Sequence, residues 1–159
     1  MTRLILALIR LMALALSYFL STLAAAAFVT FSLFLGGDAS WLSGDPEVAV
    51  GSIGFTVAVW FDIASFLFAP FLFLMLIAEL ARFTGLTINL LAGGLLAVIY
   101  MVMLPPALDQ PYVQQEIWLA ALGAGFFGGL VHWILAGHRA GRWLGPPKRI
   151  VVKDSSGPR

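Results

Sequence analysis

Four long runs with almost no charge constrain this chain more than any other feature. They cover residues 11–35, 48–78, 83–104 and 117–137. They contain one acidic residue, Asp62, one histidine, His132, and no Lys or Arg. A helix needs about 20 mainly apolar residues to cross the roughly 30 Å hydrocarbon core of a bilayer. The sequence therefore predicts an all-α, polytopic membrane protein built as a bundle of four transmembrane helices.

The composition supports a membrane protein rather than a soluble domain. Hydrophobic residues make up 61% of the 159 residues and charged residues 11%, whereas a soluble domain carries about 25% charged residues. Two of the segments between the runs, 36–47 and 105–116, contain glycine or proline, which end helices, and the third, 79–82, is short enough for a tight turn. The chain has no cysteine, which excludes disulfides, thiolate metal sites and cysteine nucleophiles.

The basic residues all fall on one side of the predicted spans. They precede the first span, lie between the second and third, or follow the fourth: Arg3, Arg10, Arg82, Arg139, Arg142, Lys148, Arg149, Lys153 and Arg159. The other two loops carry acidic residues and no Lys or Arg. The positive-inside rule then predicts that both termini are cytoplasmic. This pattern, with an uncleaved first span, favours a bacterial inner membrane.

The N-terminal region has an alternative interpretation as a secretory signal peptide. Basic residues, an apolar stretch and the alanines at 24–27 are the parts that such a peptide needs. However, the apolar run over 11–35 continues past the alanines and exceeds the roughly 7–15 residues of a signal core. We therefore expect an uncleaved first helix.

We expect one transmembrane domain over residues 1–144 and a basic, flexible cytoplasmic tail over 145–159. The tail begins with Gly145, Pro146 and Pro147, which end any helix. From His138 onward the chain carries six basic residues and one acidic residue. This charge suits a topogenic signal, and it would also attract the anionic headgroups of membrane lipids.

Small residues at four-residue spacing predict where the helices pack. Leucine gains nothing by leaving lipid for another leucine, so membrane helices associate through small residues that let their backbones approach. The expected contact positions are Ala13, Ser17 and Ser21 in the first span, Gly85 and Gly93 in the third, and Gly125 and Gly129 in the fourth. These positions fit packing within one chain and packing in a homodimer equally well.

Asp62 and Tyr100 form the first candidate polar site inside the spans. Counting back from Glu79, the roughly 20 residues that fill a bilayer reach to about residue 60, which places Asp62 near the outer boundary. Tyr100 lies about one turn before the end of the third span, at a matching depth. A hydrogen bond between the two would make Asp62 structural. The alternative is a site that handles protons or cations.

His132 and Asn89 form the second candidate, because both are expected near the inner ends of their spans. One interhelical hydrogen bond would satisfy both side chains. At the same end, Glu79 and Arg82 are three residues apart and are expected to pair as a solvated helix cap. No third ligand lies near His132 in the sequence, so we predict neither a metal site nor any other cofactor.

These features favour a non-enzymatic function. The sequence lacks the motifs of zinc peptidases, phosphate-binding loops and serine hydrolases, and it lacks a basic aromatic platform for nucleic acid. We expect a structural or accessory subunit that packs against other membrane protein subunits or a second copy. The main alternative is a small dimeric transporter or channel for protons or cations that uses Asp62 and His132. A membrane-embedded enzyme is a third class, with Asp62 and Tyr100 as its polar pair.

Overall fold

The computed structural model describes residues 2–35, 46–103 and 111–141, and this part of the chain is helical. The elements are α1 (Thr2–Leu35), α2 (Pro46–Ala81), α3 (Leu86–Met103), α4 (Pro111–Leu135) and the short 3-10 helix η2 (Gly137–Arg139). The all-α prediction is confirmed for these residues. The basic tail over 145–159 lies outside the described residues.

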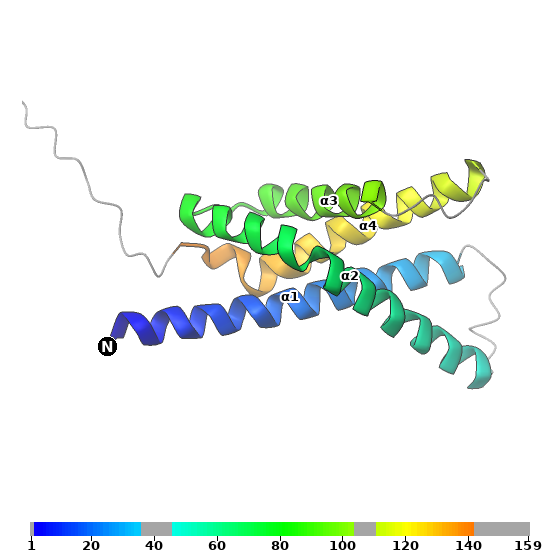
Figure 1. The fold of residues 1–159 in the computed structure, drawn as a ribbon, viewed down its shortest axis with the longest axis horizontal. Coiled ribbons are helices and arrows are strands. Elements are labelled where there is room, and N and C mark those ends of the chain that lie inside the picture. Colours follow the sequence, from blue (N-terminus) through cyan, green and yellow to red (C-terminus); the bar gives the residue numbers. More distant parts are fainter. Residues whose placement is uncertain (1, 36–45, 104–110, 142–159) are drawn as a thin grey trace, which may run out of the picture.

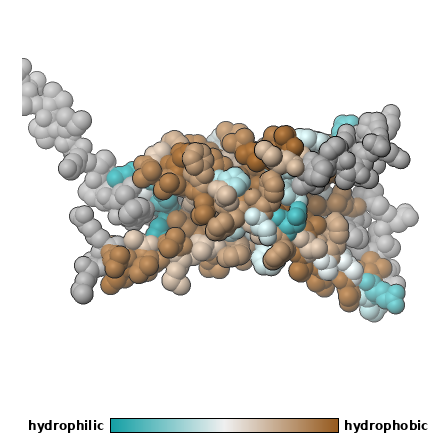
Figure 2. Space-filling model, viewed as in Figure 1, coloured by the Kyte–Doolittle hydropathy of each residue, from teal (hydrophilic) through white to brown (hydrophobic). Residues whose placement is uncertain are grey.

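Four of these helices are long and apolar enough to cross a membrane, as predicted. The qualifying segments are Leu4–Leu33, Pro46–Ala81, Leu86–Met103 and Gln115–Leu135. Large apolar side chains cover most of their outward surface. Figure 2 shows this hydrophobic surface over the body of the molecule, with many of the hydrophilic residues toward its two ends. The fold therefore fits a multi-pass transmembrane protein.

The helices extend beyond the predicted spans at three of their N-terminal ends. α1 begins at Thr2 instead of residue 11, because Arg10 lies inside the helix and does not mark its boundary. α2 and α4 begin at Pro46 and Pro111. Proline suits the first turn of a helix, since its φ is already fixed and its missing N–H would have no partner there.

The chain crosses the bundle in alternating directions (Figure 1). The start of α1, the end of α2, the start of α3 and η2 therefore lie together at one end. We call this the basic end, because Arg10, Arg82 and Arg139 belong to it. α4 packs closely on both α1 and α3, whereas α2 packs on α1 and only slightly on α3.

Three glycines bring α3 and α4 into backbone contact. A Cβ atom added at Gly93 would lie 2.1 Å from the Gly125 carbonyl oxygen and 3.0 Å from the Gly129 Cα atom. One added at Gly129 would lie 2.5 Å from the Asn89 carbonyl oxygen. Only glycine fits at such distances, because the obstructing atoms are backbone atoms that cannot rotate away.

Serines of α1 supply the contact with α4. Ser17 and Ser21 are buried, and a Cβ atom at Gly128 would lie 3.1 Å from the Ser21 carbonyl oxygen. Ala13 is half-buried. Gly85, which we expected at a helix contact, is not part of one. It precedes α3 and is exposed, and a Cβ atom there would meet only the Ile88 side chain, at 3.9 Å.

Candidate functional site

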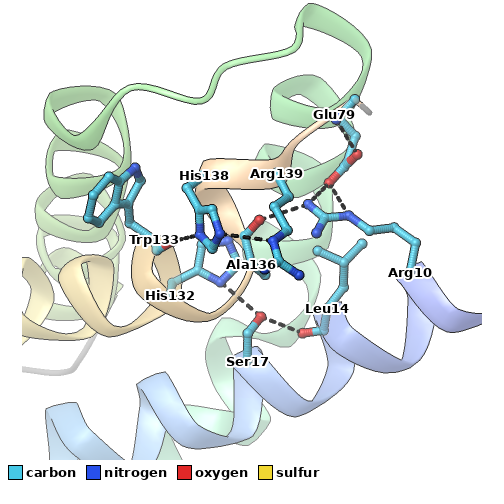
Figure 3. Close-up of polar contacts among 10 residues, drawn as sticks. Arg10, Leu14, Ser17, Glu79, His132, Trp133, Ala136, His138 and Arg139 are labelled. Atoms are coloured by element: carbon cyan, nitrogen blue, oxygen red, sulfur yellow. Dashed lines mark hydrogen bonds and ion pairs between the residues drawn. The ribbon is translucent and has the colours of Figure 1, made fainter. Parts of the chain in front are cut away.

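A buried ion pair joins α1 to α2 at the basic end (Figure 3). The side chains of Arg10 and Glu79 are 12% and 7% exposed. Arg10 Nε donates to Glu79 Oε1 at 2.9 Å, and Arg10 Nη2 donates to the Ala136 carbonyl oxygen at 3.0 Å, just after α4. One guanidinium therefore ties together three helices, using the fixed fork of donors that arginine offers.

The second Glu79 oxygen holds the segment that follows η2. Glu79 Oε2 accepts a hydrogen bond from the Gly141 backbone N–H at 2.8 Å. Gly141 has a φ of +70°, and a Cβ atom there would lie 2.4 Å from Arg82 Cγ. Glycine is thus required both for the backbone conformation and for the close approach.

The expectation that Glu79 forms a solvated cap with Arg82 is wrong. The residue is 5% exposed, and its carboxylate pairs with Arg10 of another helix. The three-residue spacing showed which charges were neighbours in sequence. It did not show that α1 would extend far enough to bring a guanidinium against the same carboxylate.

His132 lies next to the ion pair and bonds to α1. Its Nδ1 atom lies 3.0 Å from Ser17 Oγ, and the Ser17 hydroxyl donates to the Leu14 carbonyl oxygen at 2.9 Å. A hydroxyl has a single hydrogen, so in this arrangement His132 Nδ1 is the donor to Ser17. The edge-to-face Phe71 ring, 5.3 Å away between centroids, completes the surroundings.

The expected hydrogen bond between His132 and Asn89 is not formed. Asn89 Nδ2 instead donates to the Gly85 carbonyl oxygen at 2.8 Å, within its own segment. Both side chains border the same cavity, so their matching depth was correctly inferred. The rotation of each helix about its axis decides the partner, and that rotation directs His132 toward α1.

The end of α4 is fixed by a second set of hydrogen bonds around η2. Trp133 Nε1 donates to the Thr84 carbonyl oxygen at 2.9 Å, in the turn between α2 and α3. His138 Nδ1 lies 3.0 Å from the Trp133 carbonyl oxygen, and Arg139 Nε donates to His138 Nε2 at 3.0 Å. The basic end is therefore held by all four long helices.

The structure brings Asp62 and Tyr100 together, as their depths suggested. The Tyr100 hydroxyl donates a hydrogen bond to Asp62 Oδ2, linking α3 to α2. The Tyr100 ring is half-buried and packs edge-on against Phe66, with centroids 5.6 Å apart. Asp62 itself is exposed on the outer surface of α2. The carboxylate thus has a protein partner on one side and open space on the other.

A series of hydrogen bonds between α1 and α2 was not anticipated from the sequence. The Tyr18 hydroxyl donates to the Ala64 carbonyl oxygen. Trp60 Nε1 donates to Thr22 Oγ1 at 3.1 Å, and Thr56 Oγ1 donates to Thr30 Oγ1 at 2.9 Å. The available signal was the presence of hydroxyl and indole groups at matching depths in consecutive spans.

The candidate polar residues form two separate groups. His132 lies at the basic end beside Arg10 and Glu79, whereas Asp62 lies about 25 Å further along α2, from its separation of 17 residues from Glu79. Among the described residues, no group of three or more His, Asp or Glu side chains is arranged to hold a metal ion. Asp62 and His132 are thus not brought into one site within a single chain.

No family model matches the chain, and the searches of curated proteins and of solved structures also gave no match. The function is therefore argued from the geometry of the bundle.

Proposed function

We propose that this chain is a non-enzymatic structural or accessory subunit of a larger membrane complex or homo-oligomer. We place it in a bacterial inner membrane with both termini in the cytoplasm. One observation carries the proposal. The ionisable side chains that the structure describes away from the span ends are held by other groups of the bundle, namely Arg10 by Glu79, His132 by Ser17, and Asp62 by Tyr100.

Such pairing suits structure better than transport. Conduction requires polar groups at successive depths that bind an ion and release it again. In the described part of the bundle, the ionisable pairs lie in two groups separated by roughly 25 Å along α2. The cavity between the helices is bordered mainly by apolar and small residues. This arrangement favours a packing function for the bundle.

The outer half of α2 offers a surface for another helix. Several small residues of α1, α3 and α4 lie inside the bundle, among them Ser17, Gly93 and Gly129. In α2, by contrast, Gly51, Gly54 and Ala58 are exposed. Cβ atoms added at the two glycines would meet nothing within 4 Å. Gly54, Ala58 and Asp62 recur every four residues, so they share one helix face, which a close-packed neighbour could use.

Replacing Gly54 with tryptophan tests this surface. The variant should fold normally, because the site faces open space. Its affinity for the partner or second copy should fall at least about tenfold, a loss of ~1.4 kcal/mol in binding free energy. The measurement is quantitative mass spectrometry of the proteins that copurify in mild detergent, combined with the native mass of the assembly. Leu91→Trp, at an exposed position of α3, is the matched control.

Two results would contradict the proposal in different ways. Loss of the assembly in Leu91→Trp but not in Gly54→Trp would move the contact surface from α2 to α3. A wild-type chain that runs as a lone monomer, with no stoichiometric companion, would remove the accessory-subunit function itself.

The transporter alternative is tested by Asp62→Asn. In proteoliposomes we expect neither the wild-type chain nor this variant to carry protons or monovalent cations above the rate of protein-free vesicles, as read by a pH-sensitive dye and an ion electrode. A flux in the wild type that disappears in Asp62→Asn, with assembly unchanged, would overturn the proposal in favour of a transporter or channel.

A further inference from the structure

A cavity of about 120 Å³ lies between the four transmembrane helices. Its walls are mainly aliphatic, aromatic and small side chains, such as Leu67 and Met75 of α2, Leu96 of α3 and Ala124 of α4. An apolar cavity of comparable size stays free of water and binds small hydrocarbons in other proteins. The cavity is therefore suited to a hydrocarbon occupant.

The polar groups at the wall are already engaged. The Ser21 and Thr22 hydroxyls donate to the Tyr18 carbonyl oxygen at 3.0 Å, within α1. Asn89 donates to the Gly85 carbonyl oxygen. A water molecule needs two to four polar partners to be held. Each of these side chains already has a hydrogen-bond partner in the protein, as have Tyr18, Tyr100 and His132 elsewhere on the wall. Hydrocarbon is thus favoured over water.

The lining of the cavity is centred on α3 and covers about half of a bilayer's hydrocarbon core. This lining runs from Asn89 to Tyr100 along α3 and from Ala121 to His132 along α4. Each stretch rises about 16 Å at 1.5 Å per residue. Asn89 and Tyr100 each lie three residues inside the ends of α3, so the stretch crosses the middle of a roughly 30 Å hydrocarbon core. A volume of about 120 Å³ admits a short segment of one lipid chain, and the rest of that chain must lie outside the cavity.

The cavity reaches the surface between α2 and α3. Ala78 of α2 and Ala92 and Leu96 of α3 border it and remain half-buried. These two helices pack only slightly against each other, and Figure 1 shows α2 crossing away from α3. In a membrane this opening faces the lipid, so a chain can enter from the side.

Arginines lie where the headgroup of such a lipid would be. Arg82 is one turn beyond Ala78, at the end of α2. Arg139 is exposed and follows Gly137, whose added Cβ atom would lie 2.5 Å from Oδ1 of Asn89 at the inner limit of the cavity. Basic residues at this depth attract anionic headgroups.

We infer that the protein binds an anionic phospholipid in this cavity. A segment of one acyl chain occupies the cavity, the rest of the chain lies along the opening between α2 and α3, and the headgroup phosphate lies at Arg82 and Arg139. The lipid supplies the packing that α2 and α3 do not give each other. This site is separate from the 145–159 tail and does not depend on the proposed subunit function.

The experiment counts lipids bound to the full-length chain by native mass spectrometry in mild detergent, with phosphatidylglycerol or phosphatidylcholine added. We expect one phosphatidylglycerol per chain, bound more tightly than phosphatidylcholine. Ala92→Phe and Ala78→Phe, from opposite margins of the opening, should each weaken the binding of both lipids by at least about tenfold. Ala69→Phe, on the exposed surface of α2 and outside the lining, should change neither.

The headgroup is tested separately. Arg82→Gln and Arg139→Gln should each weaken the binding of phosphatidylglycerol by about fivefold and leave the binding of phosphatidylcholine unchanged. Glycerol phosphate, which has the headgroup charge but no chain, should not bind. Retention of lipid by both phenylalanine variants would overturn the cavity site. Equal binding of the two lipids, unaffected by the arginine changes, would overturn the headgroup assignment.

Discussion

Replacing Gly93 with alanine should destabilise the bundle by about 3 kcal/mol or more, at or above the upper end of the range for overpacked cores. The added methyl carbon would lie 2.1 Å from the Gly125 carbonyl oxygen and 3.0 Å from the Gly129 Cα atom. Both are backbone atoms, so α3 and α4 must move apart to make room. The effect is measured as the shift in the unfolding midpoint in mixed micelles with increasing dodecyl sulfate, followed by circular dichroism.

Gly51→Ala is the matched control for this prediction. Gly51 also lies within a helix, but a Cβ atom there would meet nothing within 4 Å. Alanine should therefore be neutral or stabilise α2 by up to about 1 kcal/mol, through its better helix propensity. Equal stability of the two variants would show that α3 and α4 do not approach as closely as described.

Removing one member of the Arg10–Glu79 pair should destabilise the protein by about 3–5 kcal/mol, the usual cost of leaving a buried charge without its partner. Arg10→Leu also removes the donor to the Ala136 carbonyl oxygen, and Glu79→Leu removes the acceptor for the Gly141 N–H. Each change therefore loosens the contact of α4 with the other helices as well. The same dodecyl sulfate titration measures both losses.

The double variant Arg10→Leu/Glu79→Leu distinguishes pairing from independent contributions. The double variant leaves neither charge of the ion pair unpaired, so the double variant should lose less stability than the sum of the two single losses. Additive losses in the double variant would show that the two side chains act independently, contrary to the ion pair.

Charge-free length was enough to predict the helices, because crossing a bilayer imposes a minimum span whatever the packing. The same criterion misplaced the start of α1. It began the first span after Arg10, because it assumed that a charged residue must lie outside the membrane-spanning segment. The structure instead extends α1 to Thr2 and buries that guanidinium against Glu79. A charge that finds its counterion does not end a membrane helix.

Depth along each helix was predictable, but rotation about the helix axis was not. Counting residues placed Tyr100 level with Asp62 and Asn89 level with His132, and the first pair is hydrogen-bonded. The second is not, because His132 is turned toward Ser17. Ser17 had been selected only for its small size. Rotation depends on how α1 and α4 pack, which no spacing within one helix determines.

The hydrogen bonds that Arg10 and Glu79 make at the basic end have a consequence for biogenesis. Arg10 leaves the ribosome well before its partners, because its carboxylate partner follows 69 residues later and its carbonyl acceptor at Ala136 follows 126 residues later. In the membrane that we propose for this chain, its long side chain must until then extend to the headgroup region, as basic side chains near helix ends do. Insertion of the first helix and its final burial are thus separate events. This end of the bundle closes only after residues 136–141 have been synthesised.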